Sequence, residues 1–245
     1  MIFLYILLGF IILLLLPFIF YVLSAIFIVL WSLLYNPKKD YEKPSKCSYG
    51  IMIYAYKLGC LISNVRIHFS GQELLPKNQR YMFISNHRSK FDHLIESVAI
   101  KNEKLAFVSK AENFKIFVGR RYIKRNCYIS LERGNGKSAV KMIIEAIRLI
   151  SKGICSVGIF PEGSRSKTLQ MLPFHAGSFK IAQKAKCPIV VSTITETEKI
   201  HKNWPKKTDV YFKIIKVYNP EEIVSRNTNE LSEEIENLMK SELAN

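Results

Sequence analysis

Residues 137–160 read KSAVKMIIEAIRLISKGICSVGIF. In the first part of this stretch, apolar side chains recur at helical spacing, at Val140, Ile143, Ile144, Ile147 and Ile150. A glycine at 153 then ends the helix, and the run 154–160 is short and mainly apolar, as is typical of a strand buried on both faces. The stretch therefore predicts a helix followed directly by an interior strand of a parallel sheet.

The alternation of strands and helices extends on both sides of this stretch. Strand patterns lie at 65–69, 81–85, 105–109, 128–131, 188–194 and 210–217, and helix patterns lie at 89–100, 177–185 and 229–243. We therefore expect one α/β domain over residues 64–245, with a mixed, largely parallel sheet flanked by helices and with 210–217 as an edge strand. In such sheets the functional loops leave the carboxyl ends of the strands.

The N-terminal part differs sharply from this domain, because residues 2–34 contain no charged side chain. A helix of that length would measure roughly 50 Å, against about 30 Å for the hydrocarbon core of a bilayer. We expect residues 1–35 to form an N-terminal membrane helix, either crossing the bilayer, which we prefer, or dipping into one leaflet with a bend at Pro17. Four lysines follow this segment at 38, 39, 43 and 46, which predicts a cell-membrane protein with its domain on the cytoplasmic side.

Residues 36–63 are interpreted as a linker and a membrane-proximal helix, which lies on the membrane or packs against the domain. The five cysteines form no C-x-x-C pair, and no H-E-x-x-H spacing occurs. These patterns favour free thiols and no metal site. The 245-residue chain is 49% hydrophobic with a net charge of +16, which excludes a disordered tail and a small disulfide scaffold.

The first candidate site is NHRSKFD, residues 86–92, directly after the strand pattern at 81–85. Ser89 suits a helix N-cap, with Asp92 in the first helical turn. Residues five apart do not share a helix face, but a turn between His87 and the helix would bring the imidazole to Asp92. The carboxylate would then accept from one ring nitrogen and leave the other as a base. A plain capped helix with a surface histidine remains the alternative.

The second candidate site is FPEGSRS, residues 160–166, after the buried strand. Gly163 permits a sharp turn, and Arg165 offers a planar fork that suits phosphate. Glu162 would orient Arg165 or bind a substrate hydroxyl. A strand-ending turn with solvated charges is equally compatible with this pattern. Six basic residues against one acid also lie between 110 and 125, which suits anionic lipid headgroups, although a solvated charged face is the alternative.

Taken together, these motifs resemble the glycerolipid acyltransferase family, of the bacterial 1-acylglycerol-3-phosphate acyltransferase type. Four blocks occur in order over roughly 80–195: Asn-His with Asp five residues after the His, an apolar strand ending in Arg133, Phe-Pro-Glu-Gly-Ser-Arg-Ser, and an apolar strand opening with Pro188. The chain departs from the family at Cys127, Glu132, His175 and Ser192, where Gly, Asp, Lys and Pro are frequent. These departures affect the expected substrate more than the reaction.

The resemblance implies a reaction and a set of roles. His87, oriented by Asp92, would act as general base on the free hydroxyl of lysophosphatidate, which attacks an acyl thioester of acyl carrier protein or coenzyme A to give phosphatidate without an acyl-enzyme. Arg133 and Arg165 would bind the glycerol phosphate, with Glu162 and Gly163 shaping that pocket. No metal or redox cofactor is expected.

Two rivals remain at this point. The acceptor is another lysophospholipid or glycerol 3-phosphate, or the protein is a non-catalytic, membrane-tethered binder of anionic lipid, which gives no reason for His87 and Asp92. Nucleic acid is not an expected partner, because the basic residues are not arranged with stacking aromatics in a recognisable module. Membrane lipid, lysophosphatidate and the acyl carrier are the expected partners.

Overall fold

A seven-stranded sheet forms the centre of the computed structural model, which describes residues 1–101, 103–166 and 168–244. The strand order is β1-β7-β6-β2-β5-β3-β4. Every strand pattern of the sequence is a strand of this sheet: β1 (Val65–Ser70), β2 (Met82–Ile84), β3 (Leu105–Lys110), β4 (Ile129–Leu131), β5 (Ser156–Ile159), β6 (Ile189–Thr195) and β7 (Thr208–Tyr218).

The sheet is mixed and largely parallel, as predicted. β6 and β7 pair antiparallel, and the other neighbours pair parallel. The prediction of an edge strand at 210–217 is wrong, because β7 lies between β1 and β6. Its alternating pattern has a different cause: one face of β7 is open to solvent, as at Tyr211, which is 53% exposed.

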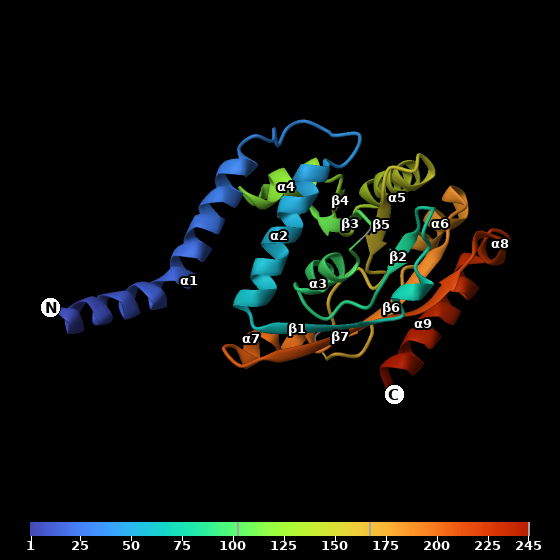
Figure 1. Cartoon of the computed structure of the whole chain (residues 1–245). Coiled ribbons are helices and arrows are strands. Elements are labelled where there is room, and N and C mark those ends of the chain that lie inside the picture. Colours follow the sequence, from blue (N-terminus) through green and yellow to red (C-terminus); the bar gives the residue numbers. More distant parts are fainter. Residues whose placement is uncertain (102, 167, 245) are drawn as a thin grey trace.

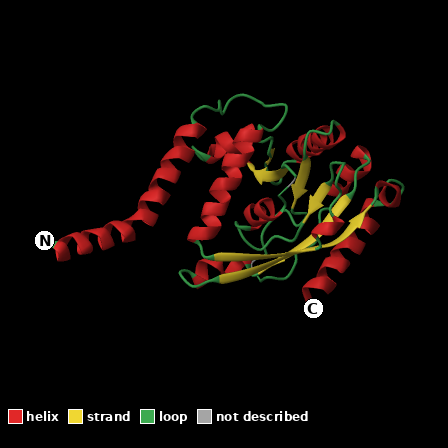
Figure 2. Cartoon of the chain, in the orientation of Figure 1, coloured by secondary structure: helices red, strands yellow, loops and turns green. Residues whose placement is uncertain are grey.

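Helices cover both faces of the sheet (Figure 2). Strand β2 shows the division, since Met82 and Ile84 face one apolar cluster and Phe83 faces the other. The first cluster includes residues of α5 (Gly136–Ser151), α6 (Lys180–Ala185) and α9 (Thr228–Ala244). The second includes residues of α2 (Lys46–Ile62), α3 (Asp92–Ala99) and α4 (Gly119–Arg125). Short elements complete the chain: η1 (Gln72–Leu74), η2 (Ala111–Lys115), η3 (Ala176–Phe179), η4 (Thr197–Lys199), α7 (Ile200–Asn203) and α8 (Pro220–Ile223).

Helix α5 packs on the core through a stripe that matches the predicted one in part, since Ile143, Ile147 and Ile150 pack there as predicted. Its buried stripe runs through Met142, Ala146, Leu149 and Ile150. Val140 and Ile144, which the pattern placed on the buried face, are 56% and 61% exposed. The segment carries apolar residues on more than one face, so spacing alone identified the face that packs only in part.

Helix α1 (Ile2–Ser32) projects from the domain and bends part-way along, and Pro17 lies inside it (Figure 1). Among the helices of the described residues, α1 alone is long and apolar enough to cross a membrane, and its apolar stretch is Leu15–Ser32. Its C-terminal part is tied to the domain, where Ser24 Oγ lies 2.7 Å from the Tyr54 hydroxyl of α2. Helix α2 itself packs on the domain through Tyr49, Met52 and Cys60, which are buried.

Candidate active site

The site begins where β2 ends, beside the ends of its neighbours β5 and β6. Asn86 follows this strand, and its buried side-chain amide donates to the Ile194 carbonyl at 2.9 Å and accepts from the Ile194 N–H at 2.8 Å. These two hydrogen bonds replace the backbone bonds that a further residue of β2 would form with β6. It ties the loop that carries His87 to β6.

Asp92 opens helix α3 and is fully buried. Its Oδ2 accepts from the backbone N–H groups of Arg88 and Ser89 at 2.7 and 2.8 Å, and from His87 Nδ1 at 2.7 Å. Its Oδ1 accepts from the Thr197 hydroxyl at 2.5 Å. Four donors at a helix N-terminus therefore meet the two acceptor oxygens of this side chain.

The helix therefore starts three residues later than the sequence predicted. Ser89 is not its N-cap; the Ser89 Oγ accepts from the Phe91 N–H at 3.0 Å inside the preceding turn. The reason is that Asp92 itself binds the N–H groups of Arg88 and Ser89, which closes the loop into a tight turn. That turn returns the His87 ring to Asp92, although the two residues are five apart.

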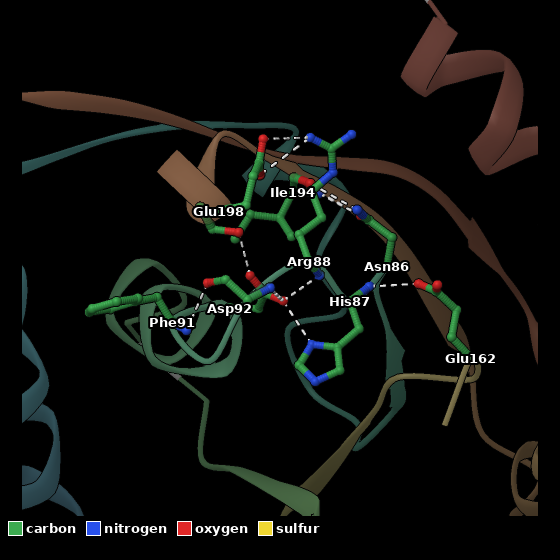
Figure 3. A network of polar contacts seen from close by, with 10 residues as sticks. Asn86, His87, Arg88, Phe91, Asp92, Glu162, Ile194 and Glu198 are labelled. Atoms are coloured by element: carbon green, nitrogen blue, oxygen red, sulfur yellow. Dashed lines mark hydrogen bonds and ion pairs between the residues drawn. The ribbon is translucent and has the colours of Figure 1, made fainter. Parts of the chain in front are cut away.

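His87 is fixed in both position and tautomer. Because Asp92 accepts at Nδ1, that nitrogen carries the hydrogen and Nε2 keeps a free lone pair. The backbone N–H of His87 donates to Glu162 Oε1 at 2.7 Å, and the imidazole ring stacks on Phe160 with centroids 4.2 Å apart. Figure 3 shows the second ring nitrogen pointing away from Asp92. An imidazole held in this way can accept a proton at Nε2.

Aromatic packing supports this ring from behind. Phe160 stacks in turn on Phe107 of β3, with centroids 5.8 Å apart. Phe107 crosses Gly158 of β5, where an added Cβ would lie only 2.5 Å from its ring. Gly158 is therefore required by the close approach of Phe107, and the aromatic stack transmits that position to His87.

A cavity of about 720 Å³ opens beside His87. Part of its wall is apolar and is formed by Phe107, Tyr128, Leu131, Met142, Ile143 and Ile159. Another part is basic and is formed by Lys90, Lys110, Arg133, Arg165 and His175. A cavity with an apolar section and several cations suits a molecule that carries both an acyl chain and a phosphate.

Arg133 and Arg165 come from different strand ends, β4 and β5, and both line this cavity. Burial lowers the pKa of Arg133, and the neighbouring positive charge of Arg165 lowers it further. Neither guanidinium forms a salt bridge within residues 1–101, 103–166 and 168–244. Two neighbouring guanidinium groups without a carboxylate partner are an arrangement that suits a dianionic phosphate.

Glu162 and Gly163 shape the wall between His87 and the arginines. Glu162 is 4% exposed, and its two oxygens accept from the backbone N–H groups of His87 and Leu172 at 2.7 and 2.8 Å, not from Arg165. Burial raises the pKa of this carboxyl group, and these two bonds oppose the shift. Gly163 has φ = 65°, and an added Cβ would lie 2.9 Å from His175 Nε2. Its conformation therefore brings His175 against the turn.

Some residues of the site were not found from the sequence. Thr197 binds Asp92 from a position 105 residues further along the chain, and Lys90 and Lys110 line the cavity. The ends of the strand patterns at 105–109 and 188–194 are the signal that would have placed Lys110 and Thr197. His93 also lines the cavity, and burial lowers its pKa to about 4, so it is uncharged at neutral pH. Among the described residues, no three His, Cys, Asp or Glu side chains are grouped as metal ligands.

The chain is similar to known proteins in both sequence and fold. The sequence profile of the acyltransferase family matches residues 66–195, which are 130 of the 245 residues and include the whole loop from His87 to Asp92. The chain belongs to the acyltransferase family. The family resemblance that the motifs indicated is therefore confirmed.

Among the curated relatives of this acyltransferase, the 1-acyl-sn-glycerol-3-phosphate acyltransferase of Cocos nucifera is 32% identical over 142 residues, 58% of this chain and 44% of the relative. The protein with the same description from Limnanthes douglasii is 30% identical over 159 residues, 64% of this chain and 54% of the relative. The chain thus spans about half the length of the curated relatives it matches.

A solved structure shares the fold. The crystal structure of the 1-acyl-sn-glycerophosphate acyltransferase PlsC from Thermotoga maritima matches with a TM-score of 0.64 and covers 94% of both chains. The two sequences are 24% identical. The match confirms the predicted fold class, an acyltransferase-type α/β sheet with a preceding helical segment.

Proposed function

We propose that this acyltransferase moves an acyl chain from a thioester to the free hydroxyl of 1-acylglycerol 3-phosphate and so forms phosphatidate. The observation that carries the proposal is the His87–Asp92 pair, whose free Nε2 borders a cavity with an apolar wall and an arginine pair. The relatives from Cocos nucifera and Limnanthes douglasii, which are named for this acceptor, support it.

The chemistry follows from the two ring nitrogens of His87. Nε2 takes the proton of the acceptor hydroxyl as its oxygen attacks the thioester carbonyl, and Asp92 stabilises the imidazolium that forms. The tetrahedral intermediate collapses, the C–S bond breaks, and the imidazolium returns its proton to the departing thiolate. The products are an oxygen ester and a free thiol. The proposed steps are proton and acyl transfer, so they require neither metal nor redox cofactor.

We assign the other substrate contacts to residues on the remaining walls of the cavity. Arg133 and Arg165 would hold the phosphate by charge-assisted hydrogen bonds and thereby place the hydroxyl at His87. Glu162 and Gly163 would keep that pocket in shape. As the donor we propose a thioester of acyl carrier protein or of coenzyme A, since both present the same phosphopantetheine thioester to the attacking hydroxyl.

The apolar wall favours an acceptor that already carries an acyl chain over glycerol 3-phosphate. Other lysophospholipids remain the alternative acceptors. A non-catalytic, membrane-tethered lipid binder would not need the four donors that fix Asp92 or the tautomer of His87. We therefore favour an enzyme of phospholipid synthesis.

The exposed apolar surface of α1 supports a place for this enzyme at the membrane. We propose that residues 1–35 are the membrane helix, that residues 36–63 connect it to the domain at 64–245, and that the domain lies on the cytoplasmic side of the cell membrane. The four lysines after α1 support this orientation. Labelling a cysteine at position 5 from each side of sealed vesicles tests whether α1 crosses.

The first test measures thiol release and phosphatidate formation by the full-length protein in detergent, with lysophosphatidate and either acyl donor. We expect His87→Ala to lower turnover by about 10²-fold or more. His68→Ala is a matched control, because His68 Nε2 also lies 2.7 Å from an aspartate, Asp209, and its ring also stacks on an aromatic residue, but outside the cavity. Turnover that survives His87→Ala would refute the mechanism. A parent protein that is active only with another acceptor would refute the assigned substrate.

A further inference from the structure

The cations of the basic segment at 110–125 fall into three groups in the structure. Lys110 lines the cavity. Lys124 lies 3.1 Å from Asp40, and Arg125 donates to the Lys43 carbonyl at 2.8 Å, so these two side chains hold the linker after α1. The remaining cations, Lys115, Arg120 and Arg121, surround an exposed apolar pair and are unexplained by the proposed reaction.

The apolar pair is Ile116 and Phe117, which are 58% and 55% exposed. The Arg121 guanidinium lies over the Phe117 ring at 4.3 Å from its centroid, and Arg120 lies at 5.8 Å. Arg121 also donates to the Phe117 carbonyl at 2.6 Å. Neither arginine forms a salt bridge in the described chain. A projecting aromatic ring with two uncompensated cations beside it is typical of a segment at a membrane interface.

The position of this pair connects the candidate membrane helix with the cavity. The Tyr122 hydroxyl of α4 donates to the Ile28 carbonyl of α1 at 2.8 Å, and Tyr122 meets Tyr35 edge to face at 5.8 Å. Figure 1 shows α4 beside the C-terminal part of α1. At the other end of the same segment, Lys110 and Asn113 line the cavity.

We propose that Ile116, Phe117, Arg120 and Arg121 form a second membrane contact, here called the α4 wedge. The apolar pair enters the headgroup region, and the two arginines bind anionic lipid phosphates. Charge complementarity and continuity with α1 both point to an anionic bilayer as the partner. This inference rests on the proposed function and deepens that function. The α4 wedge holds the cavity against the bilayer, so that a lipid acceptor enters directly from the membrane.

A depth measurement tests the contact without using activity. Phe117→Cys is spin-labelled in a Cys47→Ser background, since the other four cysteines are buried. The full chain is reconstituted in vesicles that contain phosphatidylglycerol. Val224→Cys is the matched control, because Val224 is 45% exposed and follows α8, far from α1 in Figure 1.

We expect the label at 117 to be accessible to oxygen and shielded from a water-soluble nickel complex, and the label at 224 to show the reverse. Equal exposure of both labels to nickel would overturn the proposal. Spin–spin broadening at 117 that disappears on dilution with unlabelled protein would also overturn it, because a second copy of the chain would then cover the pair.

A kinetic comparison tests the consequence. Because α1 keeps the full chain in the bilayer, the effect of Arg120→Gln with Arg121→Gln is read at the label on residue 117, which we expect to become more accessible to nickel in anionic vesicles. The KM for lysophosphatidate in such vesicles should rise, while turnover in detergent micelles stays unchanged. An equal loss in vesicles and micelles would overturn the α4 wedge, because the effect would then be general. A parent protein without turnover in either format would count against the proposed function alone, since the depth measurement still decides the wedge.

Discussion

Asp92→Asn separates the charge of Asp92 from its shape. Asparagine can still accept the two backbone N–H bonds and the His87 Nδ1–H bond at one oxygen, and the Thr197 hydroxyl can rotate to accept from the new amide. The loop geometry should therefore persist. What is lost is the negative charge beside the imidazolium that forms during proton transfer.

The size of the effect follows from the distance. With Nδ1 2.7 Å from Oδ2, the two charge centres are separated by roughly 4 Å, and at an effective dielectric constant of about 20 their attraction is about 4 kcal/mol. That energy corresponds to roughly 10³-fold in rate. We expect kcat to fall by about this factor, while the KM for lysophosphatidate changes little, since Arg133 and Arg165 are untouched.

The assay is thiol release at saturating acyl donor, with phosphatidate measured by mass spectrometry. Asp209→Asn is the control, because it removes the charge from an exposed His–Asp pair at the same 2.7 Å distance, and its kcat should match that of the parent. Circular dichroism and thermal unfolding check that the variants are folded. A folded Asp92→Asn protein whose kcat stays within about tenfold of the parent would refute the role given to this carboxylate.

Further predictions concern the cavity and the core behind it. Gly158→Ala places a Cβ 2.5 Å from the Phe107 ring, so we expect a loss of about 1–3 kcal/mol in the free energy of unfolding and a lower kcat. Denaturant unfolding and turnover measure these two quantities. Unchanged values would contradict the view that the aromatic stack supports His87. Replacing Arg133 or Arg165 by Gln should raise the KM for lysophosphatidate about 10- to 100-fold and leave kcat nearly constant; an unchanged KM would exclude that arginine from phosphate binding. Glu96 is fully buried, and burial raises the pKa of its carboxyl group well above the ordinary value. Its contribution to the free energy of unfolding is therefore greatest below the unfolded pKa of about 4.5. That contribution declines as the pH rises from there towards the folded pKa. Glu96→Gln should therefore remove this decline and unfold at a higher denaturant concentration at neutral pH; a variant with an unchanged pH dependence would show that Glu96 is ionised in the folded protein.

Local pattern was informative wherever a short stretch of chain determines its own structure. The strand patterns depend on runs of apolar and β-branched residues, and all of them are strands. The approach of His87 to Asp92 was predictable for the same reason, because a turn over five residues needs no distant partner. The buried stripe of α5 was predictable only in part: Ile143, Ile147 and Ile150 pack on the core as predicted, whereas Val140 and Ile144 are exposed.

Contacts between distant segments were beyond local pattern. Thr197 reaches Asp92 across 105 residues, and Arg133 meets Arg165 because β4 and β5 lie on either side of β3. The order of strands depends on which faces pack best after the chain has collapsed, and alternation within one strand carries no record of its neighbours. This is also why β7 was mistaken for an edge strand.

The sequence by itself determined the acyltransferase family, the α/β class, the apolar N-terminal helix and the two loops that carry His87, Asp92, Glu162, Gly163 and Arg165, because each of these depends on residues close together in the chain. The tertiary structure decided the tautomer of His87, the arginine pair and the division of the basic segment among the cavity, the linker and the α4 wedge. Those features depend on the directions in which side chains point once the sheet has brought its strand ends together. Such directions follow from packing over the whole fold, which no short stretch of residues encodes.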